Sequence, residues 1–209
     1  MTVCHVMLAS EGSRIFPQRI VNMKSNNPVL PVAIPHQSRV LQLFSTTYLA
    51  DAYETPLPEG AIHDPQALAR FIFGNQPSWV SKLMRMRDLI AARFGLKTVN
   101  RLRKSADKRV GIFKIYETHP TEVILGEDDT HLDFRVSVQV RSQSLAGHGA
   151  DFVVVSTVVH CHNLLGRSYI FFIAPFHRLV VKAGLRRAAT LGWPRTQAAP
   201  AIPNAVPHE

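Results

Sequence analysis

The sequence predicts an α+β domain in which antiparallel strands pack against one long C-terminal helix. Three observations carry this prediction. Helical periodicity occupies residues 65–94, short β-branched runs dominate 110–161, and an almost acid-free helical pattern follows over 163–190. Strands that follow one another and are closed by a helix are typical of α+β folds, whereas a parallel doubly wound sheet alternates its strands with helices.

The chain has 209 residues, of which 46% are hydrophobic, and a formal net charge of +9. That length suits one domain with loose ends, and that hydrophobic content is enough for a substantial core. Prolines and small polar residues cluster near both ends. We therefore predict a disordered segment over residues 1–39, a domain over 40–191, and a Pro- and Ala-rich flexible tail over 192–209.

The two cysteines, Cys4 and Cys161, lie far apart and accompany no metal-binding motif. Such sparse cysteine usage favours a reducing compartment, so we predict a cytoplasmic protein. The longest apolar stretch, Tyr169–Phe176, is far shorter than the roughly 20 residues that a membrane span requires. No membrane span and no signal peptide are expected.

The first elements are predicted from local signals. A strand is expected over 47–57, where prolines end it. Asp64 followed by Pro65 predicts the start of a helix, because Asp caps a helix and Pro suits its first turn. A second helix is predicted to begin after Pro77-Ser78, with its apolar residues on one stripe.

Further strands are expected over 110–116, 122–126, 130–141 and 151–161, with a glycine-containing hairpin loop over 142–150. The closing helix is expected over 163–190, capped by Asn163 and kinked at Pro175. Its predicted apolar stripe consists of Leu165, Tyr169, Phe172, Ile173, Phe176, Val180 and Ala183.

Several separated motifs follow one another along the chain: Pro77–Val80, Leu83–Asp88, Phe94–Lys97, Asp128–Arg135, Thr157–Tyr169 and Pro175–Arg178. Together they resemble the family of domains of unknown function called DUF2867, over roughly residues 45–189. One departure is Thr130, where the family usually carries Arg. The resemblance implies a helix-grip fold of the START-like or Bet v 1-like kind, in which a curved antiparallel sheet wraps a long C-terminal helix.

Folds of this kind commonly hold apolar ligands between the sheet and the C-terminal helix, although relatives include carriers, cyclases, hydrolases and regulatory proteins. The fold therefore does not decide the function. The chain contains no G-x-G-x-x-G motif, so no dinucleotide is expected, and we predict no other cofactor.

His131, Asp133 and Arg135 share one face of a predicted strand, because side chains alternate along a strand. In a cavity, Asp133 could raise the basicity of His131, which makes both candidates for acid–base catalysis. Arg135 suits an acidic ligand group. The structural alternative is a network of cross-strand hydrogen bonds and ion pairs that fixes the strand register. The sequence leaves open which face of the sheet carries these side chains.

Aromatic side chains supply further candidates for ligand contact, although a core requires the same residues. The full predicted ligand-binding set is Trp79, Phe113, His131, Asp133, Arg135, His160, Tyr169, Phe172 and Phe176. His160 and His162 lie two residues apart on one strand face, but this spacing matches no established metal site, so no metal is predicted.

The sequence thus favours a protein that binds a small apolar or amphipathic molecule. One alternative is an enzyme of the same fold, a cyclase, hydratase or hydrolase that uses His131 and Asp133. Another is an interaction module whose basic residues, dense between Lys82 and Arg109, dock an acidic partner or a membrane surface. A nucleic-acid partner is not expected, and the oligomeric state stays open.

Overall fold

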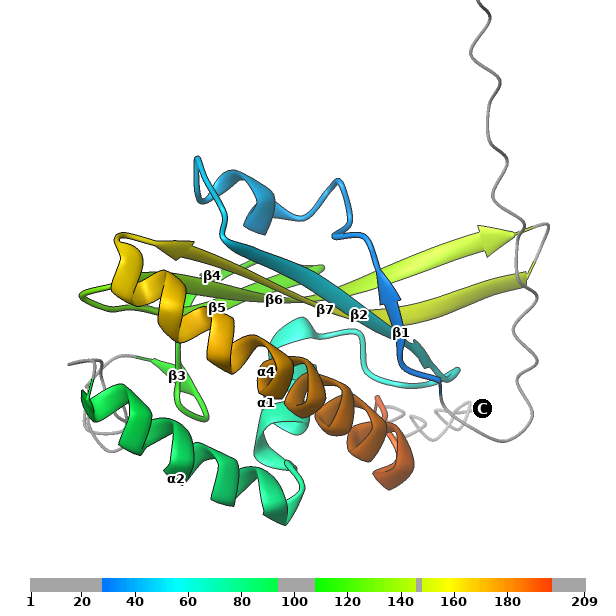
Figure 1. The fold of residues 1–209 in the computed structure, drawn as a ribbon. Coiled ribbons are helices and arrows are strands. Elements are labelled where there is room, and N and C mark those ends of the chain that lie inside the picture. The colour runs from blue at the N-terminus through cyan, green and yellow to red at the C-terminus, as the bar shows by residue number, and fades with distance from the viewer. Residues whose placement is uncertain (1–27, 94–107, 146–147, 197–209) are drawn as a thin grey trace, which may run out of the picture.

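A computed structural model describes residues 28–93, 108–145 and 148–196. These residues form a seven-stranded antiparallel sheet with the order β1-β2-β7-β6-β5-β4-β3, and the α-helices cover one of its faces (Figure 1). In chain order the elements are β1 (Leu30–Val32), the 3-10 helix η1 (Arg39–Gln42), β2 (Leu49–Leu57), α1 (Pro65–Gly74), α2 (Ser78–Arg93), β3 (Arg109–Val110), β4 (Phe113–Thr118), β5 (Glu122–Asp128), β6 (Leu132–Leu145), β7 (His148–Cys161) and α4 (Leu164–Leu191). The predicted α+β class, with a curved sheet on a long C-terminal helix, is confirmed.

The register of the sheet defines two faces. Val136 pairs with Thr157, and Val138 pairs with Val155, so these side chains share the face toward α1, α2 and α4, here called the inner face. The outer face carries the alternate residues and lies beneath the segment 33–48, which includes η1 (Figure 1). Because side chains alternate strictly, each strand residue belongs to one face.

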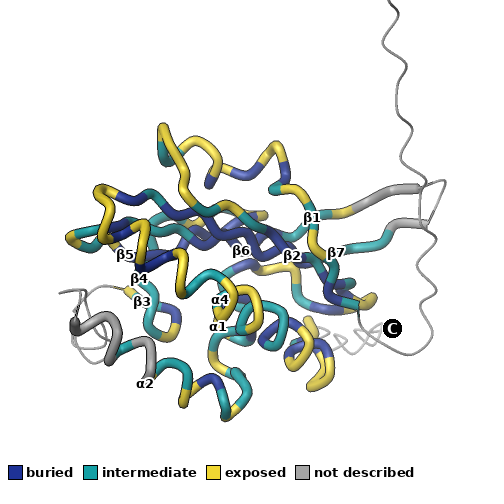
Figure 2. The backbone as a smooth tube through the Cα atoms, in the orientation of Figure 1, coloured by how far each residue is buried: buried dark blue, intermediate teal, exposed yellow. Residues whose placement is uncertain are grey.

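The main core lies between the inner face, α1 and the C-terminal half of α4. Leu68, Leu125, Val138, Val155 and Leu185 are at most 1% exposed there. Burying a side chain of this size stabilises a fold by about 1.5–3 kcal/mol. Figure 2 shows this burial concentrated in the centre of the sheet, while exposed stretches recur along α4.

Both predicted helix caps are confirmed. The Asp64 carboxylate accepts a hydrogen bond from the Gln66 backbone N–H at 3.0 Å, and Pro65 opens α1. The Asn163 side-chain oxygen accepts one from the Gly166 N–H at 3.1 Å at the start of α4. These predictions succeed because capping depends on residues that are neighbours in the chain.

The single strand predicted over 110–116 is wrong. The chain instead turns between β3 and β4 at Gly111, whose φ is +62°. Apolar alternation continues through the turn, so it imitates one strand. Glycine adopts this left-handed conformation without the steric cost that a side chain would bring.

The ends of the domain differ from the predicted boundaries. Residues 30–32 form β1, although disorder was predicted there, and Pro31 is tolerated because β1 is an edge strand. At the other end, Trp193 is 6% exposed and packs against Phe71, in what was predicted as tail. Residues 1–27 of the segment predicted as disordered and residues 197–209 of the predicted flexible tail lie outside the described residues.

Candidate functional site

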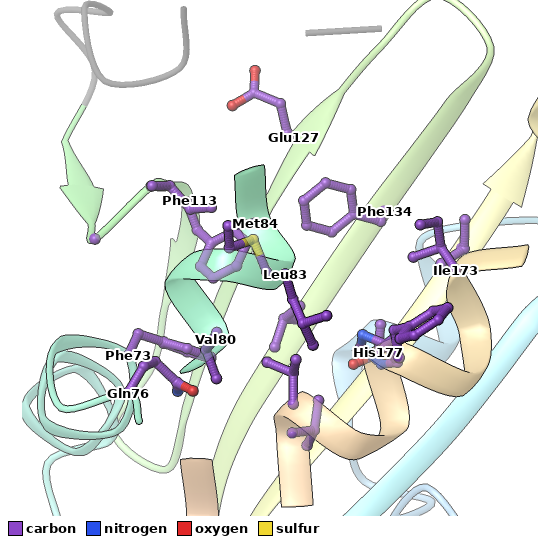
Figure 3. Close-up of a pocket in the computed structure, with 18 of the residues that line it drawn as sticks. Phe73, Gln76, Val80, Leu83, Met84, Phe113, Glu127, Phe134, Ile173 and His177 are labelled. Carbon is purple, nitrogen blue, oxygen red and sulfur yellow. The ribbon is translucent and has the colours of Figure 1, made fainter. Parts of the chain in front are cut away.

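A cavity of about 780 Å³ lies between the inner face of the sheet and the helices (Figure 3). Side chains from α1, α2, β2, β4–β7 and α4 line it, together with the turn between β3 and β4. This volume falls within the range of pockets that hold small molecules. The cavity therefore occupies the place where the sequence resemblance implies a ligand.

Most of the lining is apolar. Phe113 lies edge-on to Phe73 at 5.1 Å and to Phe134 at 5.9 Å between ring centroids, which fixes the aromatic wall beside β4 and β6. Met84 on α2 and Ile173 on α4 project toward the space in front of this wall (Figure 3). Such a lining favours hydrocarbon or aromatic surface over a charged ligand.

A small polar group interrupts the apolar lining beside α4. His177 lines the cavity, and its Nε2 lies 3.4 Å from Oδ1 of Asp51 on β2. Asp51 is the cross-strand partner of Thr157, so both side chains occupy the inner face. The Nε of Arg178 lies 3.7 Å from the other Asp51 oxygen. We call Asp51, Thr157 and His177 the inner polar group.

Two oxygens of this group, Asp51 Oδ2 and the Thr157 hydroxyl, are buried without a hydrogen-bond partner among the described residues, although Arg178 lies beside the first of them. Thr157 is 3% exposed and lines the cavity. An unpaired buried polar atom costs about 1–3 kcal/mol. A ligand with a hydrogen-bonding atom at this position would recover that cost.

Other polar groups line more distant parts of the cavity. Glu127 on β5 pairs with Arg109 at 3.1 Å, and both side chains are about 10% exposed (9% for Arg109 and 11% for Glu127). Gln76 donates from Nε2 to the Ile72 carbonyl at 2.9 Å. In Figure 3, Glu127 and Gln76 lie away from His177, so the polar atoms of the lining are spread around its apolar centre.

The structure separates the predicted ligand-binding residues into two sets. Phe113, Tyr169 and Phe176 line the cavity. The residues that do not line it are Trp79, His131, Asp133, Arg135, His160 and Phe172. Phe172 is 61% exposed, because the cavity-facing stripe of α4 includes Ile170, His177 and Val181 in place of Leu165 and Phe172.

Asp133 and Arg135 belong to an ion-pair network on the outer face. Asp133 lies 2.9 Å from the Nε2 of His162, and Arg135 donates to Asp128 at 2.7 Å. The guanidinium of Arg135 also lies 3.6 Å from the centre of the Tyr116 ring. This arrangement matches the structural alternative, a cross-strand network that fixes register. The hydrogen bond to Asp133 raises the pKa of His162, because the carboxylate favours the imidazolium form.

His131 and Asp133 do not pair with each other as a catalytic dyad would require. The Nδ1 of His131 lies 3.0 Å from the Asn163 side-chain nitrogen, while Asp133 contacts His162. His160 lies 2.8 Å from the Thr46 carbonyl oxygen and stacks on the Phe44 ring. The segment before β2 thus contacts both the Nδ1 atom and the ring face of His160.

No group of three or more His, Cys, Asp or Glu side chains within the described residues is arranged to hold a metal ion. Cys161 is 8% exposed, and burial raises the pKa of its thiol. A buried thiol with a raised pKa is a poor nucleophile, because the thiolate is the reactive form.

The ligand-binding set predicted from the sequence contains none of Asp51, Thr157 and His177. Asp51 and His177 are far apart in the chain, and only the register of β2 on β7 and the position of α4 bring them together. The available signal was weak: a lone acidic residue on the buried face of β2.

No curated protein and no solved structure matches the chain significantly. One family model, described as "Protein of unknown function (DUF2867)", matches residues 43–184. The matched region begins just before β2 and ends within α4, so it contains every residue that lines the cavity except Leu185. With most of the chain matched, the protein belongs to the DUF2867 family.

Proposed function

We propose that this protein binds a small apolar or amphipathic molecule in the cavity between the sheet and α4. The observation that carries the proposal is the Thr157 hydroxyl, which is buried at the wall of a mostly apolar cavity without a partner among the described residues. Buried polar atoms in native proteins are nearly always hydrogen-bonded. Because Thr157 also lines the cavity, a ligand atom could supply the missing partner.

The inner polar group also favours one kind of ligand head. A proton on His177 Nε2, directed at Asp51, leaves Nδ1 as a hydrogen-bond acceptor. Thr157 adds a hydroxyl that can donate or accept. A ligand hydroxyl can use both, whereas a carboxylate would be repelled by the nearby Asp51. We therefore expect a hydroxylated lipid, sterol or polyketide-like molecule.

A matched pair of variants tests this proposal. Thr55 and Thr157 both carry buried hydroxyls without a partner in the described part of the chain, but Thr55 does not line the cavity. Thermal unfolding is measured with a panel of hydroxylated and carboxylated lipids and aromatic polyketides, since a bound ligand raises the melting temperature. Thr157→Val is expected to weaken ligand binding by about 2- to 10-fold, the worth of one hydrogen bond, and Thr55→Val to leave it unchanged.

The proposal fails if no compound raises the melting temperature, or if both variants weaken binding equally. Native mass spectrometry of the purified protein provides an independent measurement, because a co-purified ligand would add its mass to the folded chain. Such a mass should disappear on denaturation.

The pairing of His177 with Asp51 favours one second candidate, an enzyme of the cyclase, hydratase or hydrolase type. A carboxylate that holds an imidazole is the arrangement of a general base. His177 and Asp51 would then have the catalytic roles that the sequence suggested for His131 and Asp133. His177→Gln is expected to weaken ligand binding by no more than about 10-fold, the worth of one hydrogen bond, and to abolish turnover. A turnover unaffected by it would exclude this candidate. The cytoplasmic location stays a prediction.

A further inference from the structure

α4 presents a second apolar face, directed away from the cavity. Leu164 is 76% exposed, Phe171 69%, Phe172 61% and Leu179 50%. We call these residues the outer α4 face. Soluble proteins seldom expose large apolar side chains in contiguous groups, and such groups mark surfaces that bind other molecules.

Helical geometry places this group on one side of α4. Leu164, Phe171 and Leu179 are separated by seven and eight residues, which is close to two turns in each case. Ile173 and His177, which line the cavity, lie on the opposite side. The helix is therefore apolar on two faces, and the sheet and cavity occupy only one of them.

The charge of α4 indicates what covers the outer α4 face. The helix contains no Asp or Glu, and its basic residues are Arg167, Arg178, Lys182, Arg186 and Arg187. Arg178, Arg186 and Arg187 are exposed. A second copy of this chain, related by two-fold symmetry, would bring these positive charges together. An anionic surface complements them, and exposed aromatic residues beside basic ones are typical of helices that lie in the lipid interface.

The arrangement favours a helix that lies on a membrane over one that crosses it. Of the described helices, α4 alone is long and apolar enough to span, with a mean hydropathy of 1.3 over its most apolar window. However, Tyr169, Ile170 and Leu185 on α4 are at most 7% exposed because they pack into the domain. A spanning helix would lose these contacts, whereas a helix lying parallel to the surface keeps them.

We propose that the outer α4 face docks on the surface of an anionic lipid bilayer, with Phe171 and Phe172 inserted among the lipids and the basic residues of α4 against the headgroups. Phe176 is 41% exposed and also lines the cavity, so the docked face adjoins the cavity wall. An exchange of ligand between bilayer and cavity rests on the proposed function. The docking itself does not.

Vesicle flotation of the full chain tests the docking. Vesicles of phosphatidylcholine alone are compared with vesicles that contain 30% phosphatidylglycerol, both at low and at high salt. We expect the protein to float with the anionic vesicles and to be released by salt, because part of the attraction is electrostatic. The double variant Phe171→Ser and Phe172→Ser is expected to lower the vesicle partition coefficient about tenfold or more.

The matched control is Leu191→Ser, which removes an apolar side chain of α4 that is 51% exposed but lies outside the outer α4 face. Equal loss of binding in the control and the double variant would overturn the proposal. Absence of flotation with anionic vesicles would overturn it too, and would direct attention to an acidic protein partner. Thr157→Val should still float, because it leaves the outer α4 face unchanged. If the parent protein floats although no compound raises its melting temperature, this inference is supported and only the proposed function is contradicted.

Discussion

His162 and Asp133 form a contact whose strength depends on pH. The carboxylate raises the pKa of His162 above its ordinary value through a 2.9 Å contact with Nε2. In the unfolded chain that pKa is about 6.5. The contact thus contributes its full stabilisation below about pH 6.5, and this contribution is lost as the pH rises through the higher pKa of the folded protein.

We therefore expect Asp133→Asn to destabilise the protein more at pH 5.5 than at pH 8.5. The free energy of unfolding is measured with urea at both values. Asn keeps an oxygen that can accept from the Asp129 N–H, so the change chiefly removes the charge. Equal losses at the two pH values would contradict this assignment of the raised pKa to Asp133.

At the scale of elements, the start of α4 is held against β6 by a close backbone contact. A Cβ atom built on Gly166 would collide with the carbonyl oxygen of His131. The backbone N–H of His162, just before α4, also donates a hydrogen bond to the His131 carbonyl, at 2.9 Å. The close approach of the His131 carbonyl is what requires glycine at position 166. The φ angle of Gly166 is not positive, so backbone conformation does not require it.

Gly166→Ala is accordingly expected to lower the free energy of unfolding by about 1–3 kcal/mol, because overpacking forces the helix from the strand. Gly74→Ala is the matched control. A Cβ at Gly74 meets nothing within 4 Å, so alanine there should be neutral or stabilise α1 by up to about 1 kcal/mol. Denaturation curves of the two variants that coincide would show that the contact at Gly166 carries no strain.

The elements also show which parts of the fold the sequence predicts well. Helix starts at Pro65 and Leu164 follow from caps within a few residues, so local chemistry is sufficient. The turn at Gly111 was missed because its apolar pattern runs on unbroken. The predicted apolar stripe of α4 differs from the side that faces the cavity, because the helix is apolar on two faces. Periodicity alone does not say which of the two faces meets the sheet.

At the scale of the whole molecule, Glu122 ties the N-terminal segment to the outer face of the sheet. It is 3% exposed and accepts hydrogen bonds from the hydroxyls of Ser38 and Ser137, each at 2.5 Å, and from the Arg39 N–H at 3.0 Å. Ser38 and Arg39 lie outside the residues that the family model matches. The family region therefore relies on a neighbouring segment of this chain to satisfy a buried carboxylate.

Glu122→Ala would leave the two hydroxyls and the N–H without their acceptor. We expect the free energy of unfolding to fall by about 3 kcal/mol or more, since each unpaired buried group costs about 1–3 kcal/mol. Limited proteolysis should then cut before β2 sooner than in the parent protein. Glu117→Ala provides the control, because the partly exposed pair of Glu117 with His119 is expected to contribute less than about 1 kcal/mol. Proteolysis that is unchanged in Glu122→Ala would contradict this role.

The candidate site was predictable only in its general place. The resemblance implied a cavity between the sheet and the last helix, and the aromatic residues Phe113, Tyr169 and Phe176 do line it. Its polar residues were not predicted, because Asp51 and Thr157 become neighbours only through the pairing of β2 with β7, which are far apart in the chain. The functional prediction was placed instead on residues 131–135, because three ionisable side chains lie there on one strand face. In the structure Asp133 and Arg135 form pairs on the outer face of the sheet.

β7 lies inside the sheet and forms part of the cavity wall. β7 is hydrogen-bonded along both edges, to β2 and to β6, and supplies Val155, Thr157 and Val159 to the cavity wall. Strands paired on both sides are among the last parts of a protein to open. The sheet side of the cavity is therefore expected to be its rigid part, and the helical side, formed by α2 and α4, the more movable one. The ligand proposed above would then enter by separation of these two helices, while the sheet stays closed.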